Sequence, residues 1–175
     1  YYPVGEGNTD ITNYVTFNYA ENVWSVGTLV RGTWIEAGTR DYPLAASIIT
    51  SDDNNYLYRH ETGYDDDGSA MTAYIESGDV ELGEGERFMF LSRMIPDFRF
   101  SGDTDSASMD ITIKGKKFPL QSSSTLATAT VTSSTEQNFL RTRARNSIFR
   151  VESSGLGYGW RLGDFRFDVR QDGRR

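Results

Sequence analysis

The chain has 175 residues, a formal net charge of −7 at pH 7 and 13% aromatic residues. This length suffices for one domain with a hydrophobic core, or for one domain and a fragment of another. No stretch of about eighteen apolar residues occurs, which excludes a membrane-spanning helix. The absence of cysteine excludes disulfides and thiolate metal sites, and is compatible with a reducing cytoplasm or with a particle assembled in one.

Composition and residue pattern both favour β-structure. Ten Tyr, ten Phe and three Trp supply the bulky side chains that strands prefer, and 17 Gly supply turns. No segment shows the sustained apolar period of about 3.6 residues that an amphipathic helix would require. The sequence therefore predicts an all-β protein.

A hairpin is expected near the N-terminus. Residues 13–19 alternate between apolar and polar side chains, and a turn at 20–22 leads into an apolar segment at 23–35. Hairpins of this kind are common as the outer pair of β-propeller blades. The chain holds no clean internal repeat, which excludes a complete propeller.

The strands that follow are separated by short polar turns. Turns are expected at 51–54 and 115–117, and Pro96 is expected to interrupt one strand segment. This succession predicts an antiparallel β-sandwich or jelly-roll-like domain at residues 41–175, after an N-terminal hairpin segment at 1–40. The strand segments are 44–49, 55–61, 71–77, 87–100, 106–114 and 126–132, followed by two longer arginine-bearing strands.

The arginine-bearing end of the chain is its most distinctive feature. Residues 139–175 contain nine of the eighteen basic residues, and all nine are Arg. Several alternate with apolar or small residues, which predicts a strand pair with one packing face and one face of planar guanidinium groups. Such a face suits contact with a neighbouring strand, a neighbouring subunit or a phosphate. The interface candidates are Arg141, Arg143, Arg145, Arg161, Arg166 and Arg170.

Charge is divided unevenly along the chain. Residues 1–136 carry a net charge of −12 and residues 137–175 a net charge of +5. An acidic body with a basic end is typical of self-association or docking, although two solvated faces of a soluble sheet protein have the same pattern. The arginines are expected to pair with Glu152, Asp164 and Asp168, or with the acidic surface of another copy.

Residues for catalysis or metal binding are scarce. His60 is the only histidine, and no nucleophile motif of the type Gly-x-Ser-x-Gly accompanies it. The run Asp65-Asp66-Asp67 before Gly68 carries the hard oxygen ligands that calcium prefers, but its spacing does not match an EF-hand loop. Acidic loop tips also prevent edge pairing between sheets. The sequence therefore predicts no enzyme and no cofactor, with Asp65, Asp66 and Asp67 as weak metal candidates.

Two kinds of ligand remain as alternatives. An acidic, aromatic β-protein is compatible with glycan binding or hydrolysis, since aromatic side chains can form a sugar platform and carboxylates can cleave glycosidic bonds. Nucleic acid would require exposed aromatic rings beside the arginines, and Phe149, Tyr158 and Trp160 are near them in sequence. The candidate sugar platform consists of Trp24, Trp34, Tyr56, Tyr58 and Tyr74.

Four segments together resemble a family of virion proteins. The chain resembles the C-terminal part of packaged-DNA stabilisation and tail-hub or nozzle proteins of tailed phages. The resemblance lies in the order of its motifs, which are the hairpin, the HETG-to-DDDG segment, IESG, and RTRAR with WRLG. The resemblance covers most of the chain. The segments are residues 13–34, 54–68, 74–98 and 141–175.

This resemblance implies a non-enzymatic structural subunit at the tail or head–tail junction of a virion that assembles in the host cytoplasm. It implies a ring of identical copies, commonly six, around the DNA passage, with other tail or portal proteins as partners and without sequence-specific DNA binding. The N-terminal hairpin would then be a propeller-blade remnant. The alternatives are a virion-borne carbohydrate- or receptor-binding domain and a glycan-active enzyme.

Overall fold

The computed structural model describes residues 1–48 and 55–174 of the chain. Within these residues it contains fifteen strands and no helix, which confirms the predicted all-β class. Every pairing between these strands is antiparallel. The turn expected at 51–54, the last part of the strand expected at 44–49, and Arg175 lie outside the described residues.

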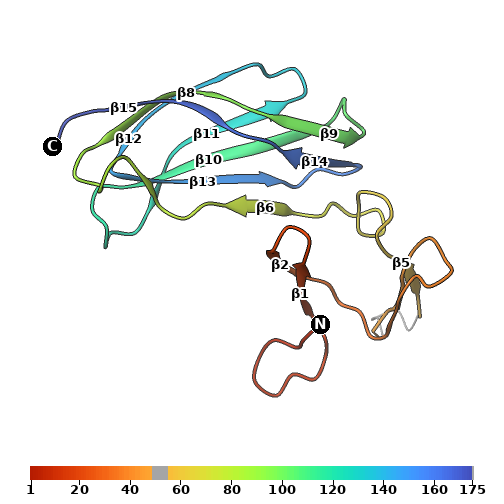
Figure 1. The fold of residues 1–175 in the computed structure, drawn as a ribbon. Coiled ribbons are helices and arrows are strands. Elements are labelled where there is room, and N and C mark those ends of the chain that lie inside the picture. The colour runs from red at the N-terminus through yellow and green to blue at the C-terminus, as the bar shows by residue number, and fades with distance from the viewer. Residues whose placement is uncertain (49–54, 175) are drawn as a thin grey trace. The chain divides into compact units, whose positions relative to one another are not determined.

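The chain divides into two compact units, Tyr1–Gly63 (unit 1) and Tyr64–Arg175 (unit 2), and most of their strands are labelled in Figure 1. The boundary lies further along the chain than the one predicted between residues 40 and 41. The reason is that strand β3 pairs with β4 across that position, so both belong to one sheet.

Unit 1 contains two small sheets. The predicted hairpin is present, and Phe17 lies opposite Trp24 with their rings stacked 4.4 Å apart. The long segment predicted at 23–35 is interrupted, so its end pairs in a different sheet. The strands are β1 (Asn13–Asn18) with β2 (Val23–Thr28), and β3 (Trp34–Ile35), β4 (Leu44–Ala46) and β5 (Leu57–Arg59) in that order.

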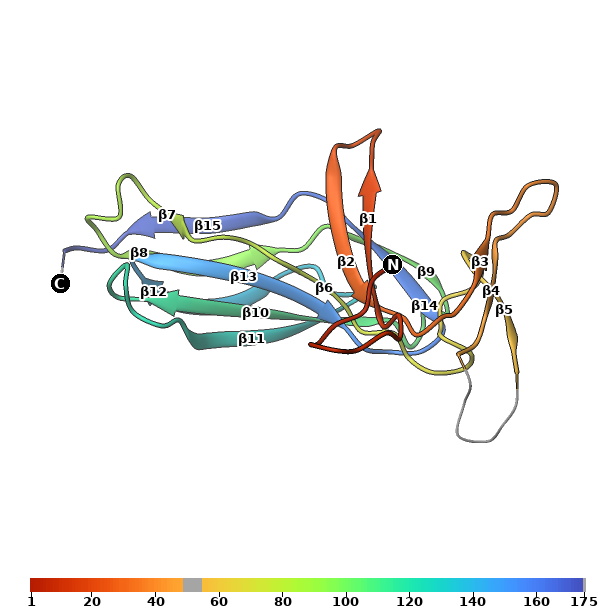
Figure 2. The same cartoon turned by 90° about the horizontal axis from the view of Figure 1, so that it is seen from below.

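One layer of unit 2 is a five-stranded sheet with β10 and β13 at its centre. Figure 2 shows β13, β10 and β11 side by side. The turn expected at 115–117 is wrong, because β10 continues through Gly115 and Lys116. The sheet contains β11 (Ser124–Thr132), β10 (Ser108–Lys116), β13 (Asn146–Ser153) and β6 (Ala73–Glu76), with β7 (Val80–Glu81) also paired to β13.

The other layer is a bent ribbon built on β8. Strand β8 has β12 on one side and β15 on the other, and Pro96 ends it as predicted. The chain then continues into β9, which pairs with β14. The strands are β12 (Asn138–Ala144), β8 (Met89–Ile95), β15 (Arg166–Gln171), β9 (Phe98–Gly102) and β14 (Tyr158–Leu162).

A β-bulge lies in the middle of β8. Arg93 pairs with Asp168 and Leu91 with Val169, which leaves Ser92 as one extra residue relative to β15. Because of this extra residue, Leu91 and Met94 are both buried although they are three positions apart.

The core of unit 2 lies between the two layers, as in a β-sandwich. Met109, Ile111 and Ile113 of β10 are buried, as their alternation predicts, and they pack with Leu91 and Met94 of β8. Gly115 lies where the layers come close together, since a Cβ atom there would be 2.8 Å from the Cβ of Ala144. Contacts from both sheets therefore hold unit 2 together.

The arginine-bearing end does not form the predicted strand pair. It forms four strands, β12 to β15, and β12 and β13 belong to different layers. Strands β12 and β15 lie in one sheet, but β8 separates them. The alternation of residues predicts which side chains of a strand share a face. It carries no information about which strands are neighbours in a sheet.

Candidate functional site

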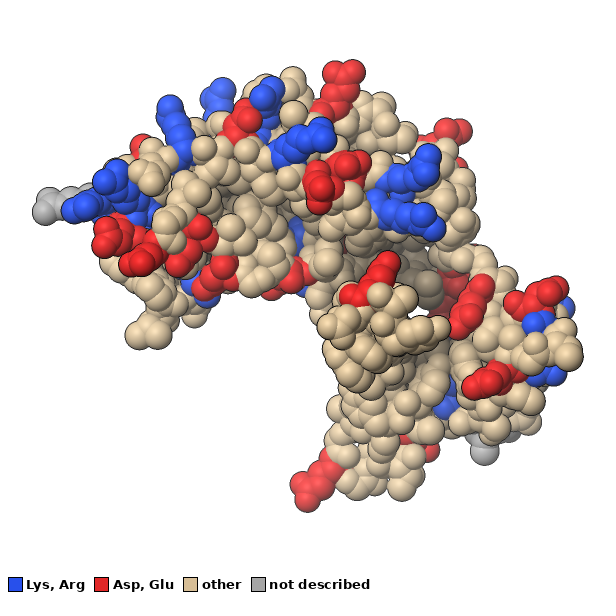
Figure 3. Space-filling model, viewed as in Figure 1, with Lys and Arg blue, Asp and Glu red and all other residues tan. Residues whose placement is uncertain are grey.

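The outward face of the β8 layer carries most of the predicted interface arginines, and we call it the arginine face. Arg143 of β12 and Arg170 of β15 both lie directly opposite Phe90 of β8, so these three side chains form one row on the same side of the sheet. The guanidinium of Arg170 lies over the Phe90 ring, 4.8 Å from its centre. Figure 3 shows basic side chains gathered over these strands with acidic ones between them.

A second row crosses the same sheet. Phe139 of β12 and Asp168 of β15 lie opposite Arg93 of β8. The Nε of Arg93 donates to Oδ2 of Asp168 at 2.7 Å, which is an exposed ion pair of small net stabilisation. Phe139 is 65% exposed, an unusual position for a phenylalanine in the middle of a charged face.

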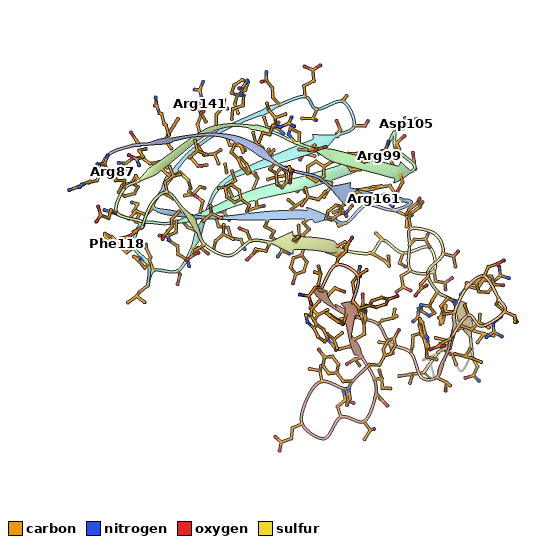
Figure 4. All side chains as sticks on the ribbon, viewed as in Figure 1. Arg87, Arg99, Asp105, Phe118, Arg141 and Arg161 are labelled. Carbon is orange, nitrogen blue, oxygen red and sulfur yellow. The ribbon has the colours of Figure 1, made fainter. Side chains whose placement is uncertain are left out.

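The arginine face continues onto β9 and β14. The two parts of the ribbon join where the N–H of Gly163 donates to the carbonyl oxygen of Asp97 at 2.8 Å. On these strands Phe98, Phe100 and Trp160 pack toward the core. Arg99 and Arg161 alternate with them, lie directly opposite each other and are exposed (Figure 4).

Five arginines on this face lack an internal counterion. In the part of the chain that the structure describes, no ion pair or side-chain hydrogen bond is formed by Arg99, Arg141, Arg161, Arg166 and Arg170. Arg141 has a φ of 48° at a bulge between β12 and β8, which turns its exposed side chain outward. These guanidinium groups are free to meet an external anion.

The outward face of the other layer differs because its cations are paired. Lys114 and Arg150 both contact the Glu76 carboxylate, at 2.7 and 3.3 Å, and Arg150 also contacts Glu152 at 2.6 Å. The Arg150 guanidinium lies over the Tyr74 ring at 3.8 Å. The predicted pairing of an arginine with Glu152 is therefore present, and this face has little charge left for a partner.

The network around Glu76 predicts a dependence of stability on pH. The hydrogen bond from Lys114 lowers the pKa of Glu76 below its ordinary value of 4.5, partial burial opposes this, and the hydrogen bond from Arg150 adds to it. A carboxyl group with a lowered folded-state pKa stabilises the fold above its unfolded pKa, and this contribution is lost as pH falls through the folded value.

We therefore expect the gap in unfolding free energy between the native chain and Glu76→Gln to be largest near neutral pH and to shrink below pH 4.5. Urea unfolding at a series of pH values measures this gap. Glu136→Gln is the control, because Glu136 is exposed and outside every ion pair of the described residues. A gap for Glu76→Gln that stays constant with pH would contradict the assignment.

Arg143 and Arg145 have structural roles at the end of the chain. Arg143 donates from Nε to Oδ2 of Asp172 at 2.6 Å, and its guanidinium lies 3.9 Å from the centre of the Phe88 ring. Arg145 lies between β12 and β13 and donates to the loop before β8, and its guanidinium lies 4.8 Å from the centre of the same Phe88 ring. The chain leaves β12 at Ala144, and the alternation of that strand ends there.

Arg145 binds three backbone carbonyl groups. Its Nη1 donates to the oxygens of Gly85, at 3.2 Å, and of Glu86, and its Nη2 donates to the oxygen of Arg174 at 2.7 Å. Its Nε is buried and has no partner among the described residues. This side chain therefore fastens the chain end to the loop between β7 and β8.

The aromatic residues that are near the arginines in sequence face the core. Tyr158 is buried and donates its hydroxyl to the carbonyl oxygen of Ser108 at 2.7 Å. Trp160 donates to Ser153 Oγ at 2.9 Å, and Phe149 stacks on Phe167. Sequence alternation alone could have excluded Trp160, because it alternates with Arg161 and so lies on the opposite side of β14.

The structure gives other roles to His60 and the aspartate run. His60 Nε2 accepts from Arg31 Nε at 3.2 Å, and its ring lies 4.5 Å from that of Trp34. Asp65 Oδ1 accepts from the Gly68 amide at 3.0 Å in a turn. Among the described residues no three His, Cys, Asp or Glu side chains converge as metal ligands. Asp52 and Asp53, which have the same pattern, lie outside the described residues.

A shallow polar pocket of about 390 Å³ contains two carboxylates on neighbouring strands. Asp110 of β10 lies directly opposite Glu152 of β13. Thr130 donates to Asp110 at 2.7 Å and Arg150 holds Glu152, so each carboxylate has a structural partner. The only aromatic residue lining the pocket is Tyr158, which is buried, so the pocket lacks a platform for a sugar ring.

The five aromatic residues considered as a sugar platform are divided among several strands. Trp24 stacks on Phe17, and Trp34 contacts His60. The guanidinium of Arg31 covers the Tyr58 ring at 3.9 Å. Only Tyr56 and Tyr58 lie near each other, with ring centres 6.0 Å apart, and Tyr74 belongs to unit 2, where Arg150 lies over it.

No known protein family matches this chain, and no curated protein is significantly similar to it. Among residues 1–48 and 55–174 there is also no helix with the length and apolar character needed to cross a membrane. The arginine face of unit 2 is therefore the best candidate for a functional surface.

Proposed function

We propose that the chain is a non-enzymatic structural subunit of a tailed-phage virion, located at the tail or head–tail junction. It assembles with other copies and with tail or portal proteins around the DNA passage. The order of motifs in residues 13–34, 54–68, 74–98 and 141–175 supports the virion class by resemblance. The surface chemistry of unit 2 supports assembly by docking.

The observation that carries the proposal is the set of unpaired arginines on the arginine face. An exposed guanidinium is a planar group with five donors that suits carboxylate partners. On the opposite layer Lys114 and Arg150 have acidic partners inside the chain, whereas Arg141 and Arg166 have none in the described residues. Cations that the fold leaves unpaired on an exposed sheet face suit an acidic partner surface.

A second copy of the chain can supply that partner. The chain has a net charge of −7, and exposed acids such as Glu84 and Glu136 lie in its loops. A contact between different patches of identical copies is heterologous, and it produces a ring when the rotation between copies closes. Complementary charge would speed and orient such docking.

The test is the mass of the full chain in solution, combined with a low-resolution image of the particles. We expect a closed ring in low salt that dissociates as salt is raised, because exposed charges are screened over about 8–10 Å at physiological ionic strength. Arg141→Glu with Arg166→Glu should leave the chain monomeric. Lys117→Glu is the matched control, since Lys117 is exposed on the turn after β10.

A chain that stays monomeric in every condition while binding a glycan would refute the proposal and support the carbohydrate-binding alternative. Rings that form equally well with the reversed arginines would refute the role of the arginine face. The mass measurement distinguishes monomers from rings in both cases. A glycan array measures the glycan binding.

A further inference from the structure

Arg99 of β9 and Arg161 of β14 are the most unusual pair on the arginine face. They lie directly opposite each other, both are exposed, and neither has an acidic partner in the described residues. Side chains at such positions have Cβ atoms about 4.5–5.5 Å apart, and like charges there destabilise the sheet. A shared anion would remove this repulsion.

The row beside this pair carries an aromatic ring. Gly159 precedes Arg161 by two residues and lies on the same side of β14. A Cβ atom at Gly159 would be 2.8 Å from the Tyr64 ring, so the absence of a side chain there lets the ring lie against the strand. Tyr64 keeps 40% of its surface exposed. An accessible ring therefore stands next to two unpaired guanidinium groups.

The other neighbouring row has one acid. Gly163 follows Arg161 by two residues, and a Cβ atom there would be 2.5 Å from the Asp97 carboxylate, so Asp97 lies over that glycine. Asp97 is exposed and forms no ion pair in the described residues. It lowers the local positive charge without neutralising either arginine directly.

We infer that Arg99, Arg161 and Tyr64 form a binding site for single-stranded nucleic acid. The two guanidinium groups bind a backbone phosphate, because their planar donors match its oxygens. The exposed Tyr64 ring stacks with the adjacent base, as aromatic rings do in sequence-tolerant single-strand sites. This site goes beyond the proposed assembly role, which uses Arg141 and Arg166.

Nucleic acid explains the site better than an acidic protein does. A carboxylate-bearing partner would use the arginines but would have no use for the ring beside them. A nucleotide uses both, since each carries a phosphate and a flat base. The net charge of −7 repels a polyanion at a distance, so binding should depend on these local contacts and on low salt.

The experiment is titration of the full chain with a fluorescently labelled oligothymidylate, followed by anisotropy at several salt concentrations. We expect Arg99→Gln with Arg161→Gln to weaken binding and to reduce the slope of log K against log salt by roughly 0.7 for each phosphate that the variant no longer binds. Tyr64→Leu should weaken binding on the order of tenfold without changing that slope. Asp97→Asn should strengthen it.

The controls separate this site from the assembly proposal. Arg141→Gln with Arg166→Gln should leave oligothymidylate binding unchanged even where it abolishes assembly. The double variant at Arg99 and Arg161 should remain folded, because it removes a repulsion, and its thermal transition checks this. Absence of salt-sensitive binding by the native chain overturns the inference. Equally tight binding of polyglutamate through the same residues also overturns it, in favour of an acidic protein partner.

Discussion

Replacing Ile111 by alanine is expected to lower the free energy of unfolding of unit 2 by about 2–5 kcal/mol. Ile111 is fully buried on β10, the strand that pairs with both β11 and β13. Its side chain packs in the cluster that joins the two layers, so the layers cannot close over the space it leaves without moving a sheet.

Fluorescence of Trp160 during urea unfolding measures this destabilisation, in a background where Trp24 and Trp34 of unit 1 are replaced by phenylalanine. Trp160 then reports on unit 2 alone, because it packs against the same core. Thr112→Ala is the matched control on the same strand, since Thr112 lies on its other side and should cost under about 1 kcal/mol. Equal destabilisation by both variants would contradict the sandwich core.

Replacing Arg145 by glutamine should be the most damaging change among the arginines and should lower the free energy of unfolding by more than about 2 kcal/mol, because hydrogen bonds from a charged donor contribute roughly 1.5–3 kcal/mol each. Arg145 donates to the carbonyl oxygens of Gly85, Glu86 and Arg174 from one side chain. The three carbonyl groups lie in the loop before β8 and at the chain end, so removing all three hydrogen bonds together loosens both segments.

Hydrogen exchange locates this effect. The amides of Phe88 and Asp172 connect the two segments, with Phe88 donating to Gly173 and Asp172 donating to Phe88. Both should exchange faster in Arg145→Gln than in the native chain, and Arg145→Lys should rescue them only in part because lysine lacks the planar fork. Arg141→Gln is the control and should change stability by less than about 0.5 kcal/mol. Similar destabilisation at both positions would refute the structural role of Arg145.

Much of the fold follows from alternation along the chain. The inward positions of β10 and the break at Pro96 are predicted because a strand places alternate residues on opposite faces and proline cannot donate to a ladder. The separation of β12 from β13 is not predictable in this way. Arg145 continues the alternation of arginines with other residues in the sequence, but at this residue the chain leaves β12 and enters the other layer.

The candidate site could be predicted only in part. The arginines of β12 and β15 were recognisable because charged side chains occupy every second position there, Arg141 and Arg143 in β12 and Arg166, Asp168 and Arg170 in β15. Arg99 and Tyr64 were not, since Arg99 lies far from Arg161 in sequence and only the pairing of β9 with β14 brings them together. Tyr64 meets this pair through the missing side chain of Gly159, a contact that no periodic pattern encodes.

The bulge at Ser92 has a consequence for recognising relatives of this chain. Without Ser92 the inward residues Met89, Leu91 and Met94 would fall at every second position. A relative that lacks this residue would therefore keep the same residues of β8 facing inward and the same pairing with β15. Deletion of one residue at Thr112 would instead exchange the two faces of half of β10. An alignment of distant relatives should therefore place a one-residue gap at Ser92 and none within β10.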